Sequence, residues 1–122
     1  MTKKQFKTKT SNKQAKFSTG MVRDVADDKP RFDLLIPLDQ KYDDTILYRW
    51  AMLMNRGAQH YGERNWEKAK TQNELNRFKQ SLFRHLIQYL CDYDDEDHAS
   101  AILFNVMGAE YTKNQLIKKR KK

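Results

Sequence analysis

Cysteine, proline and glycine are scarce in this chain of 122 residues, which has one, two and four of them, respectively. The single cysteine, Cys91, excludes an internal disulfide and a zinc site built from paired cysteines, so a reducing cytoplasm is the simplest location. No run of about 18 apolar residues is present, which argues against a transmembrane helix. The N-terminus is basic but lacks the apolar stretch of a signal peptide, and we therefore expect a cytoplasmic protein without membrane contact.

Positive charge is sparse in the middle of the chain and concentrated at its ends. Residues 1–16 contain six lysines and no acid, and residues 113–122 contain five lysines, one arginine and no acid. Residues 17–112 contain 12 basic and 16 acidic side chains, so their net charge is −4, although the whole chain carries +8. An acidic domain is a poor general surface for nucleic acid, whose binding is driven by Lys and Arg. The basic tails could make weak contact with nucleic acid, and the alternative is that they only add solubility.

Apolar residues recur at three- and four-residue steps in three segments, a spacing typical of amphipathic helices. The expected helices are residues 44–60, 72–91 and 95–117. Thr71 and Glu74 have the spacing of a capping box before the second helix, and Asp43 or Asp44 is the expected cap of the first. No segment alternates convincingly with a period of two, and no internal repeat is evident. The predicted fold class is therefore all-α, a small three-helix domain.

The stretch before the first expected helix contains both prolines, Pro30 and Pro37. A proline disfavours helix at the residue before it, so an extended or turn-rich N-terminal arm is expected here. We expect its apolar side chains to lie against the helices; they are Phe32, Leu34, Leu35, Ile36 and Leu38. The predicted organisation is a disordered basic tail over residues 1–16, a single helical domain over 17–112 and a disordered basic C-terminal tail over 113–122.

The segment RGAQHYGERNWEKA, residues 56–69, has many more functional side chains than a simple link between helices requires. Arginine can bind phosphate oxygens, asparagine can bond a base or sugar edge, and tyrosine and tryptophan can stack on a base. The candidate nucleotide-binding residues of this segment are Arg56, Tyr61, Arg64, Asn65 and Trp66. The alternative is a compact connector whose aromatic rings cover the core and whose arginines pair with nearby acids.

Polar residues on the second and third expected helices form a second group of candidates. His85 lies at the edge of the apolar face of the second helix, and Asn105 lies on or beside the apolar stripe of the third, where a buried amide needs partners or a ligand. If the two helices are antiparallel, His85 and His98 come close together near the turn, with Arg84 beside them. The alternative is that each of them is a core polar residue whose hydrogen bonds are satisfied.

The turn between these two helices, DYDDEDH at residues 92–98, contains five carboxylates. Hard cations such as Mg²⁺ prefer oxygen ligands, usually one or two carboxylates together with substrate phosphates. Asp94, Asp95 and Asp97 are therefore candidate magnesium ligands, although their spacing matches no fixed metal motif. Carboxylates in a first helical turn also favour the helix dipole, so the alternative is helix capping beside a solvated turn.

Taken in order, the segments TGMVRD, DKPRFDLLIP, RGAQHYGERNWEKA, RHL, DEDH and FN resemble the motifs of a phage-associated family. The family is named for the N-terminal domain of dATP/dGTP diphosphohydrolases, and the similarity covers residues 18–110. It implies a phage-encoded nucleotide-pool protein of the host cytoplasm that removes pyrophosphate from a purine deoxynucleotide. The matched motif positions are Arg31, Asp33, Gly57, Tyr61, Asn65, Trp66, Glu67, Arg84, His85, Asp95, Asp97, His98 and Asn105.

This resemblance adds Arg31 to the nucleotide-binding candidates, because it matches the arginine of the K-P-R motif. The chain departs from the family pattern at two positions of the central motif. His60 stands where lysine is common, and Ala69 stands where glycine is common. A third departure is in DYDDEDH, which lacks the usual Gly-Glu and has a shorter spacer before the histidine. The geometry at the start of the third helix is therefore the least transferable part of the pattern.

Three functions are consistent with these residues. The first is an enzyme in which Mg²⁺ on Asp94, Asp95 or Asp97 prepares a water for attack on the α-phosphorus, with His85 or His98 as base. Asp95 and Asp97 then belong to the catalytic group, and the arginines, Arg84 included, offset charge on the phosphates. The second is a non-catalytic protein that sequesters a host nucleotide, and the third is a nucleic-acid accessory protein that uses the basic tails. So short a chain leaves apolar surface uncovered, so we also expect a homo-oligomer.

Overall fold

The computed structural model describes residues 7, 8, 10, 13–24 and 28–120. The chain divides into two compact units, Met1–Asp33 and Leu34–Lys122. In the first unit, the strands β1 (Gln14–Lys16) and β2 (Val22–Asp24) pair in antiparallel fashion. The turn between them contains Gly20, whose φ of 90° is a conformation that favours glycine.

This hairpin corrects the prediction for the N-terminal tail. Residues 1–16 were expected to be disordered, but β1 lies within that range, so the prediction is wrong for Gln14–Lys16. The Gly20 turn explains the difference, because it returns the chain so that β2 can pair with a stretch that has no apolar periodicity of its own. Residues 1–6, 9 and 11–12 of the expected tail lie outside the described residues.

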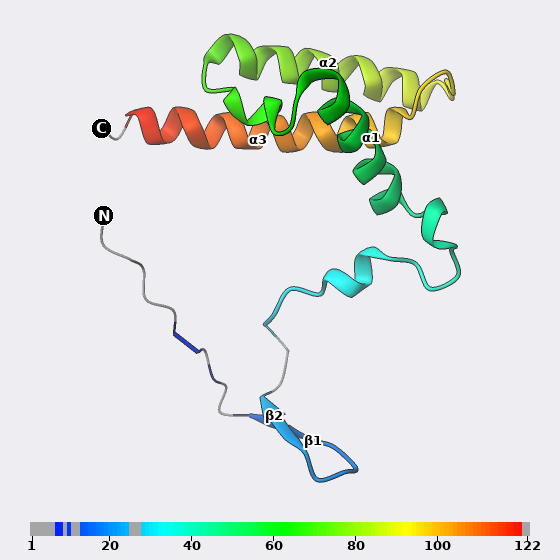
Figure 1. Cartoon of the computed structure of the whole chain (residues 1–122), viewed down its shortest axis with the longest axis vertical. Coiled ribbons are helices and arrows are strands. Elements are labelled where there is room, and N and C mark those ends of the chain that lie inside the picture. The colour runs from blue at the N-terminus through cyan, green and yellow to red at the C-terminus, as the bar shows by residue number, and fades with distance from the viewer. Residues whose placement is uncertain (1–6, 9, 11–12, 25–27, 121–122) are drawn as a thin grey trace. The chain divides into compact units, whose positions relative to one another are not determined.

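The helices of the second unit confirm the predicted all-α class. The elements after the hairpin are η1 (Phe32–Leu35), η2 (Tyr42–Asp44), α1 (Ile46–Tyr61), η3 (Asn65–Lys68), α2 (Gln72–Leu90) and α3 (His98–Arg120), where η denotes a 3₁₀ helix. α2 and α3 lie side by side and run in opposite directions, and α1 packs against α3 (Figure 1). The antiparallel arrangement on which the expected histidine pair depends is therefore present.

The capping side chains explain where two of these helices begin. Thr71 and Glu74 form the predicted capping box of α2, in which each side chain accepts a hydrogen bond from the backbone N–H of the other residue. The prediction for α1 is wrong, because its cap is Thr45, whose Oγ1 accepts the N–H of Tyr48 at 3.1 Å. The two aspartates expected to cap α1 lie in η2, one turn earlier in the chain.

α3 is longer at its C-terminal end than the sequence pattern indicated. The sequence predicted helix to residue 117 and also a disordered tail over 113–122, and these two ranges overlap. α3 continues to Arg120, so the helix prediction is confirmed to 117 and the expected disorder is wrong for residues 113–120. Basic side chains in a last turn interact favourably with the negative end of the helix dipole, and Lys118, Lys119 and Arg120 lie there. Residues 121–122 lie outside the described residues.

Small side chains predominate among the buried residues of α3, which are His98, Ser100, Ala101, Asn105, Gly108, Ala109 and Thr112. Gly108 shows why size matters here: a Cβ atom built on it would lie 2.4 Å from Cε1 of Phe78 on α2. Real Cβ contacts are not that short, so this close approach of the two helices requires glycine. The α2–α3 interface is therefore tightly packed around the Phe78 ring.

Several large apolar side chains remain exposed. Those of the predicted arm are Phe32, Leu34, Leu35, Ile36 and Leu38. The expectation that they lie against the helices is wrong for the four that belong to the second unit, because all four are exposed to solvent. A further exposed set on α2 is Phe83, Leu86, Ile87 and Leu90. No helix among the described residues combines the length and apolar character needed to cross a membrane.

Candidate functional site

A cavity of about 580 Å³ lies between α1, η3, α2 and α3. It is the place where most of the predicted site residues meet, although they come from distant parts of the sequence. Eight of them line it: Arg56, Tyr61, Arg64, Asn65, Trp66, His85, Asp97 and Asn105. One wall comes from the end of α1 and from η3, and the other comes from α2 and the first turns of α3.

The first wall is shaped by a sharp reversal of the chain after α1. Gly62 ends the helix with a φ of 97°, and its N–H donates to the carbonyl of Ala58 at 2.9 Å. Arg64 then adopts a φ of 56°, which is uncommon for a residue other than glycine. Its guanidinium pairs with Glu67, which holds the positive charge at the cavity wall. Local backbone geometry thus brings the functional residues of the 56–69 segment together.

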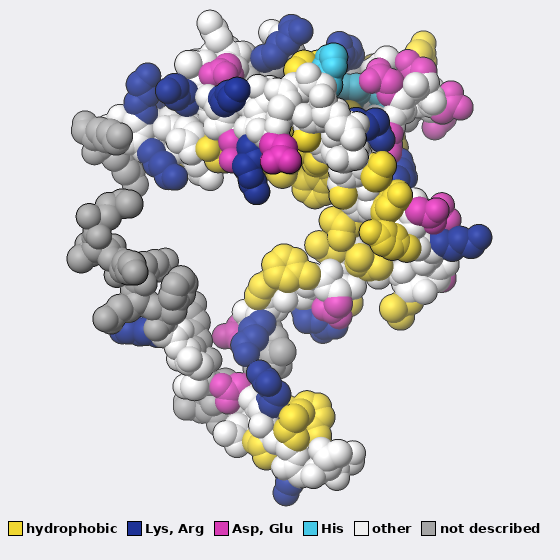
Figure 2. All heavy atoms as spheres, viewed as in Figure 1, with side chains coloured by type: hydrophobic (Ala, Val, Ile, Leu, Met, Phe, Trp, Pro, Cys, Tyr) yellow, Lys and Arg dark blue, Asp and Glu magenta, His cyan; other side chains and the backbone are white. Residues whose placement is uncertain are grey.

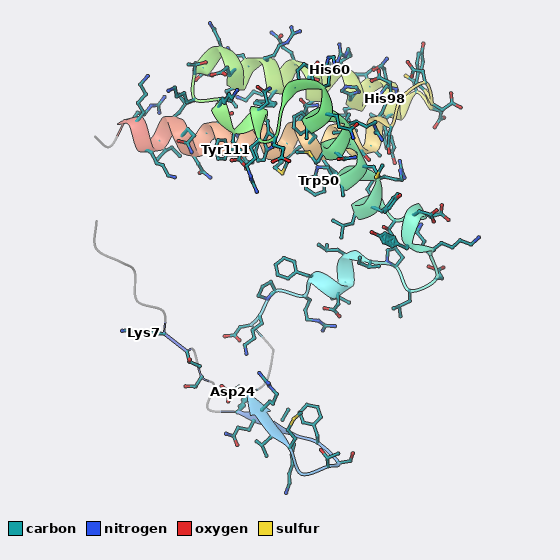
Figure 3. All side chains as sticks on the ribbon, in the orientation of Figure 1. Lys7, Asp24, Trp50, His60, His98 and Tyr111 are labelled. Carbon is teal, nitrogen blue, oxygen red and sulfur yellow. The ribbon has the colours of Figure 1, made fainter. Side chains whose placement is uncertain are left out.

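The two aromatic rings of this wall have different surroundings. Trp66 is half-buried, and its ring makes edge-to-face contacts with Tyr111 at 5.3 Å and Phe104 at 6.5 Å between ring centroids. Figure 3 shows Tyr111 well along α3, whereas His98 lies near the start of the same helix. Tyr61 is 67% exposed and contacts only His60 among the described aromatic rings. Trp66 therefore also covers the core, as the connector interpretation expected, and Tyr61 is freer to stack on a ligand.

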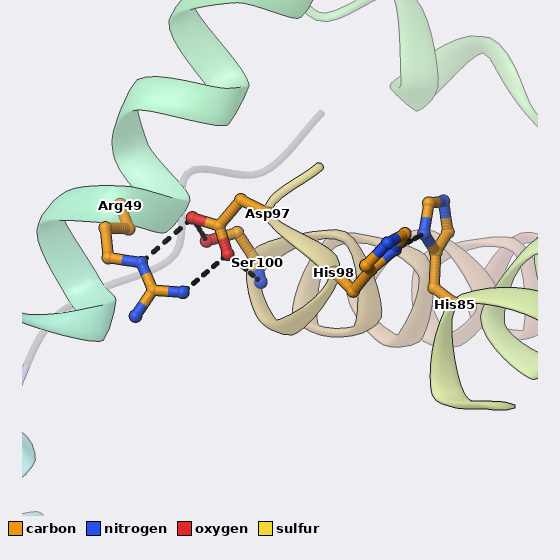
Figure 4. Close-up of polar contacts among 5 residues, drawn as sticks. All are labelled: Arg49, His85, Asp97, His98 and Ser100. Atoms are coloured by element: carbon orange, nitrogen blue, oxygen red, sulfur yellow. Dashed lines mark hydrogen bonds and ion pairs between the residues drawn. The ribbon is translucent and has the colours of Figure 1, made fainter. Parts of the chain in front are cut away.

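The second wall contains two buried histidines that touch each other. His85 Nδ1 and His98 Nδ1 are 2.8 Å apart, which confirms the proximity expected from the sequence (Figure 4). His98 Nε2 lies 2.8 Å from Asp95 Oδ1. Asn105 is also buried, and its Nδ2 donates to the carbonyl of Ala101 at 2.8 Å. Figure 2 shows histidine side chains close to the acidic side chains of the α2–α3 turn.

The hydrogen bonds restrict how the protons are placed on this cluster. The bond with His98 holds the pKa of the Asp95 carboxyl below its usual value, so Asp95 is ionised and accepts the Nε2–H of His98. One proton lies between His85 Nδ1 and His98 Nδ1, so one of these nitrogens donates and the other accepts. Burial lowers the pKa of His85, with a smaller contribution from the positive charge of Arg84, so this imidazole is neutral at neutral pH.

The resemblance seen in the sequence and this arrangement of its motif residues lead to a family. This chain belongs to the dATP/dGTP diphosphohydrolase N-terminal family, which matches it over residues 19–120. No curated protein and no solved structure matches it. The match includes all residues that line the cavity, so the cavity is part of the dATP/dGTP diphosphohydrolase N-terminal domain.

Asp97 of this family domain is engaged in structural bonds. Its carboxylate accepts two hydrogen bonds from Arg49. Arg49 Nε donates to Oδ2 at 2.9 Å, and Arg49 Nη2 donates to Oδ1 at 2.6 Å. Ser100 adds its hydroxyl at 2.8 Å and its N–H at 3.2 Å, so Asp97 also caps α3. The bond with Arg49 is the main reason that the pKa of Asp97 falls to about 2. Sequence reasoning missed Arg49, because no spacing rule links positions 48 residues apart.

The remaining predicted residues of the family domain lie outside the cavity lining. Arg84 approaches His85 Nε2 at 3.5 Å and lines a smaller cavity of about 220 Å³ together with Arg77. Asp94 is exposed. Arg31 lies in the first unit, where it forms a two-bond ion pair with Asp33 at 2.7 and 2.9 Å.

Possible metal ligands gather elsewhere than predicted. Among the described residues, one group of three has ligand atoms within 4.8 Å of one another, and it consists of His85, Glu96 and His98. Asp94, Asp95 and Asp97 do not form such a group. Sequence reasoning missed Glu96, although its position two residues before His98 in DEDH is a usable signal. Magnesium on the three aspartates stays a prediction without a matching cluster.

Proposed function

We propose that this protein hydrolyses a purine deoxynucleoside triphosphate to the monophosphate and pyrophosphate. The observation that carries the proposal is the cavity of about 580 Å³ on which arginines, aromatic rings, amides and the imidazole of His85 converge. Its volume lies within the range of about 300–1,000 Å³ typical of small-molecule sites. Membership of the dATP/dGTP diphosphohydrolase N-terminal family supports the same reaction and the purine base.

The first wall supplies groups suited to binding a nucleotide. Arg56 and Arg64 contact phosphate oxygens and offset the negative charge that builds up on them during the reaction. Tyr61, the more exposed aromatic ring, stacks on the base. Asn65 and Asn105 bond base or sugar edges from opposite walls of the cavity.

The second wall supplies groups suited to positioning the attacking water. In the overall reaction, the water oxygen adds to the α-phosphorus, and the bond from that phosphorus to the oxygen bridging to the β-phosphate breaks. His85 lies at the cavity surface and is held by His98, which in turn is held by Asp95. This chain of hydrogen bonds fixes the ring orientation of His85, so we assign the imidazole pair to the water.

A divalent cation, when bound, would polarise the phosphate and lower the pKa of a water. The aspartates expected to hold magnesium fit this role poorly. Asp97 already accepts four hydrogen bonds from Arg49 and Ser100. Asp95 is bonded to His98, and Asp94 belongs to no cluster of three possible ligands among the described residues. The proposal therefore does not depend on magnesium at these positions.

The test is a turnover panel in which the eight common ribo- and deoxynucleoside triphosphates are incubated with protein and divalent cations, with pyrophosphate and phosphate release followed separately. We expect pyrophosphate from dATP or dGTP. Arg64→Ala should lower kcat/KM by about 10²-fold, because it removes a charge that stabilises the transition state. Lys79→Ala removes an exposed charge of α2 that does not line the cavity, and should leave the rate unchanged. Phosphate release, or equal loss in both variants, would contradict the proposal.

The second candidate is a nucleotide-binding protein without turnover. It is favoured by the engagement of Asp97 in structural bonds, because the groups that bind a nucleotide are present whether or not a metal is held there. A ligand-induced thermal shift with dATP or dGTP, without release of pyrophosphate, would establish this alternative. Loss of the shift in Arg64→Ala would then place the nucleotide in the cavity.

A further inference from the structure

We propose that His85, His98 and Glu96 bind one divalent first-row transition-metal ion, of the Mn²⁺, Fe²⁺, Co²⁺ or Zn²⁺ class, at the edge of the cavity. One nitrogen of each histidine and one carboxylate oxygen lie within 4.8 Å of one another. The role of this ion as a cofactor for hydrolysis rests on the proposed function. Binding of the ion does not depend on turnover.

The imidazole geometry is close to that of two ligands of one ion. His85 Nδ1 and His98 Nδ1 are 2.8 Å apart. Two nitrogens at about 2.1 Å from one ion, at right angles to each other, are about 3.0 Å apart. The two rings must therefore separate by a few tenths of an ångström, to about 3.4 Å for a tetrahedral ion, and rotate slightly. Both lone pairs then point to an ion beside the line that joins the nitrogens, and the proton between them is displaced.

Asp95 orients one of these ligands in the way that is usual at metal sites. It accepts the Nε2–H of His98 at 2.8 Å, which orients this ring with Nδ1 toward His85. Metal-binding histidines nearly always donate their second ring N–H to a carboxylate, a carbonyl or water. His85 Nε2 faces the Arg84 guanidinium at 3.5 Å, and its Nδ1 faces His98. An ion that binds both Nδ1 atoms displaces the proton between them, so metal binding should release a proton to solvent.

The composition of the cluster selects the class of metal. Imidazole nitrogens suit Zn²⁺, Fe²⁺ and neighbouring ions, whereas Mg²⁺ prefers oxygen ligands and keeps much of its water. Three protein ligands leave further positions of the ion open, as in catalytic zinc sites. His85 and Glu96 both line the cavity, so these open positions are accessible to the phosphates of a bound nucleotide.

The test uses untagged full-length protein that has been stripped of metal with a chelator and then titrated with Co²⁺, without nucleotide. We expect the visible absorption of a Co²⁺–imidazole site, saturating at one ion per chain, and its displacement by Zn²⁺. A large excess of Mg²⁺ should not displace it. Absence of saturable binding would overturn the inference.

Variants locate the ion. His85→Gln and His98→Gln should abolish the absorption, and Glu96→Gln should change its intensity and weaken binding. Asp95→Asn should weaken binding by about 10–100-fold, because it removes only the partner that orients His98. Glu96 and Asp95 are exposed, so their variants remain informative if the variants of the two buried histidines fail to fold, which circular dichroism would report.

Two matched controls remove neighbouring groups that lie outside the cluster. Asp94→Asn removes an adjacent exposed carboxylate, and His60→Gln removes the third histidine of the chain. Both should keep the Co²⁺ spectrum and the affinity. A spectrum that is unchanged in intensity and affinity by Glu96→Gln, that survives His98→Gln in folded protein, or that is lost in Asp94→Asn, would refute the site. Metal binding without turnover would refute only the proposed function.

Discussion

The two ends of the α2–α3 interface are built from opposite kinds of residue. Near the turn, the interface buries the polar pair His85 and His98. Farther along, the ring of Phe78 packs against Gly108 and lies edge-to-face with Phe104. Apolar packing stabilises a fold directly, whereas burying polar groups costs free energy unless their hydrogen bonds replace those with water. The turn end is therefore the part of the interface that stability alone does not explain.

The largest expected effect is on turnover, from a change at the turn end. His85→Gln keeps a polar side chain but removes the imidazole that we assign to the attacking water. We expect kcat to fall by about 10²-fold or more, because the water loses its position. KM should change little, since the nucleotide is held mainly by the other wall. Steady-state kinetics beside a thermal melt would decide: a variant that loses stability and raises KM, but keeps kcat, would make His85 a structural residue.

The packed end should show the next largest effect, and it should be on stability. Gly108→Ala places a methyl group against the Phe78 ring and should destabilise the protein by about 1–3 kcal/mol, as overpacking does. Gly57→Ala is the matched control, because it is also a helical glycine and nothing lies within 4 Å of its added Cβ. It should stabilise α1 by about 0.5–1 kcal/mol. Urea unfolding of both variants measures this difference, and equal effects would contradict the close approach seen at Gly108.

Asp97 links the turn end of the α2–α3 interface to α1 through Arg49, and its contribution to the free energy of unfolding should depend on pH. Its folded pKa of about 2 lies below the ordinary value of 3.8, so its stabilising effect is complete above pH 3.8 and is lost as the pH falls through 2. After allowance for solvent screening of the half-exposed Arg49, we expect this effect to be about 1–2 kcal/mol. Asp97→Asn should abolish this part of the acid dependence. Thermal melts from pH 6 to pH 2 that fall in parallel for both proteins would show that the Arg49 pair contributes nothing.

Sequence periodicity was sufficient for the parts of the molecule that local rules determine. The three helices, the Thr71 capping box and the proximity of His85 and His98 all follow from three- and four-residue spacing and an antiparallel turn. Composition, rather than spacing, indicated residues 56–69 as a candidate site, and the five nucleotide-binding candidates of this segment line one cavity. These features depend on neighbours in the sequence or on a single short connection.

Features that depend on distant contacts or on backbone strain were not predictable in this way. The ion pair between Arg49 and Asp97 joins residues 48 positions apart. Sequence reasoning could not detect this partner and therefore treated Asp97 as a carboxylate available to bind a metal ion. Glu96 was missed as a possible ligand because its partner His85 comes from the other helix, although its position two residues before His98 was a usable signal. The left-handed conformation of Arg64 also has no signal in the sequence, because non-glycine residues rarely adopt it.

Substitutions on the outer face of α2 should have the smallest effect on the stability of the single chain. This face is exposed, whereas the opposite face of α2 packs on α3. Phe83, Leu86, Ile87 and Leu90 are exposed at steps of three, one and three residues, which places them along one stripe. A second copy presents the same stripe, so a twofold-symmetric pair could cover both. We therefore expect light scattering to give a mass above the 14.6 kDa of one chain.

Ile87→Glu together with Leu90→Glu tests this stripe. Each substitution is on the surface of the single chain, where changes are usually within about 0.5 kcal/mol, so the helical circular dichroism should persist. A charge in an apolar contact between copies lacks a partner, and the variant should therefore elute with the mass of one chain. Asn114→Glu together with Lys118→Glu, at exposed positions of α3 rather than α2, should leave the assembly intact. If the native protein already has the mass of one chain, the exposed stripe on α2 is not a contact between copies.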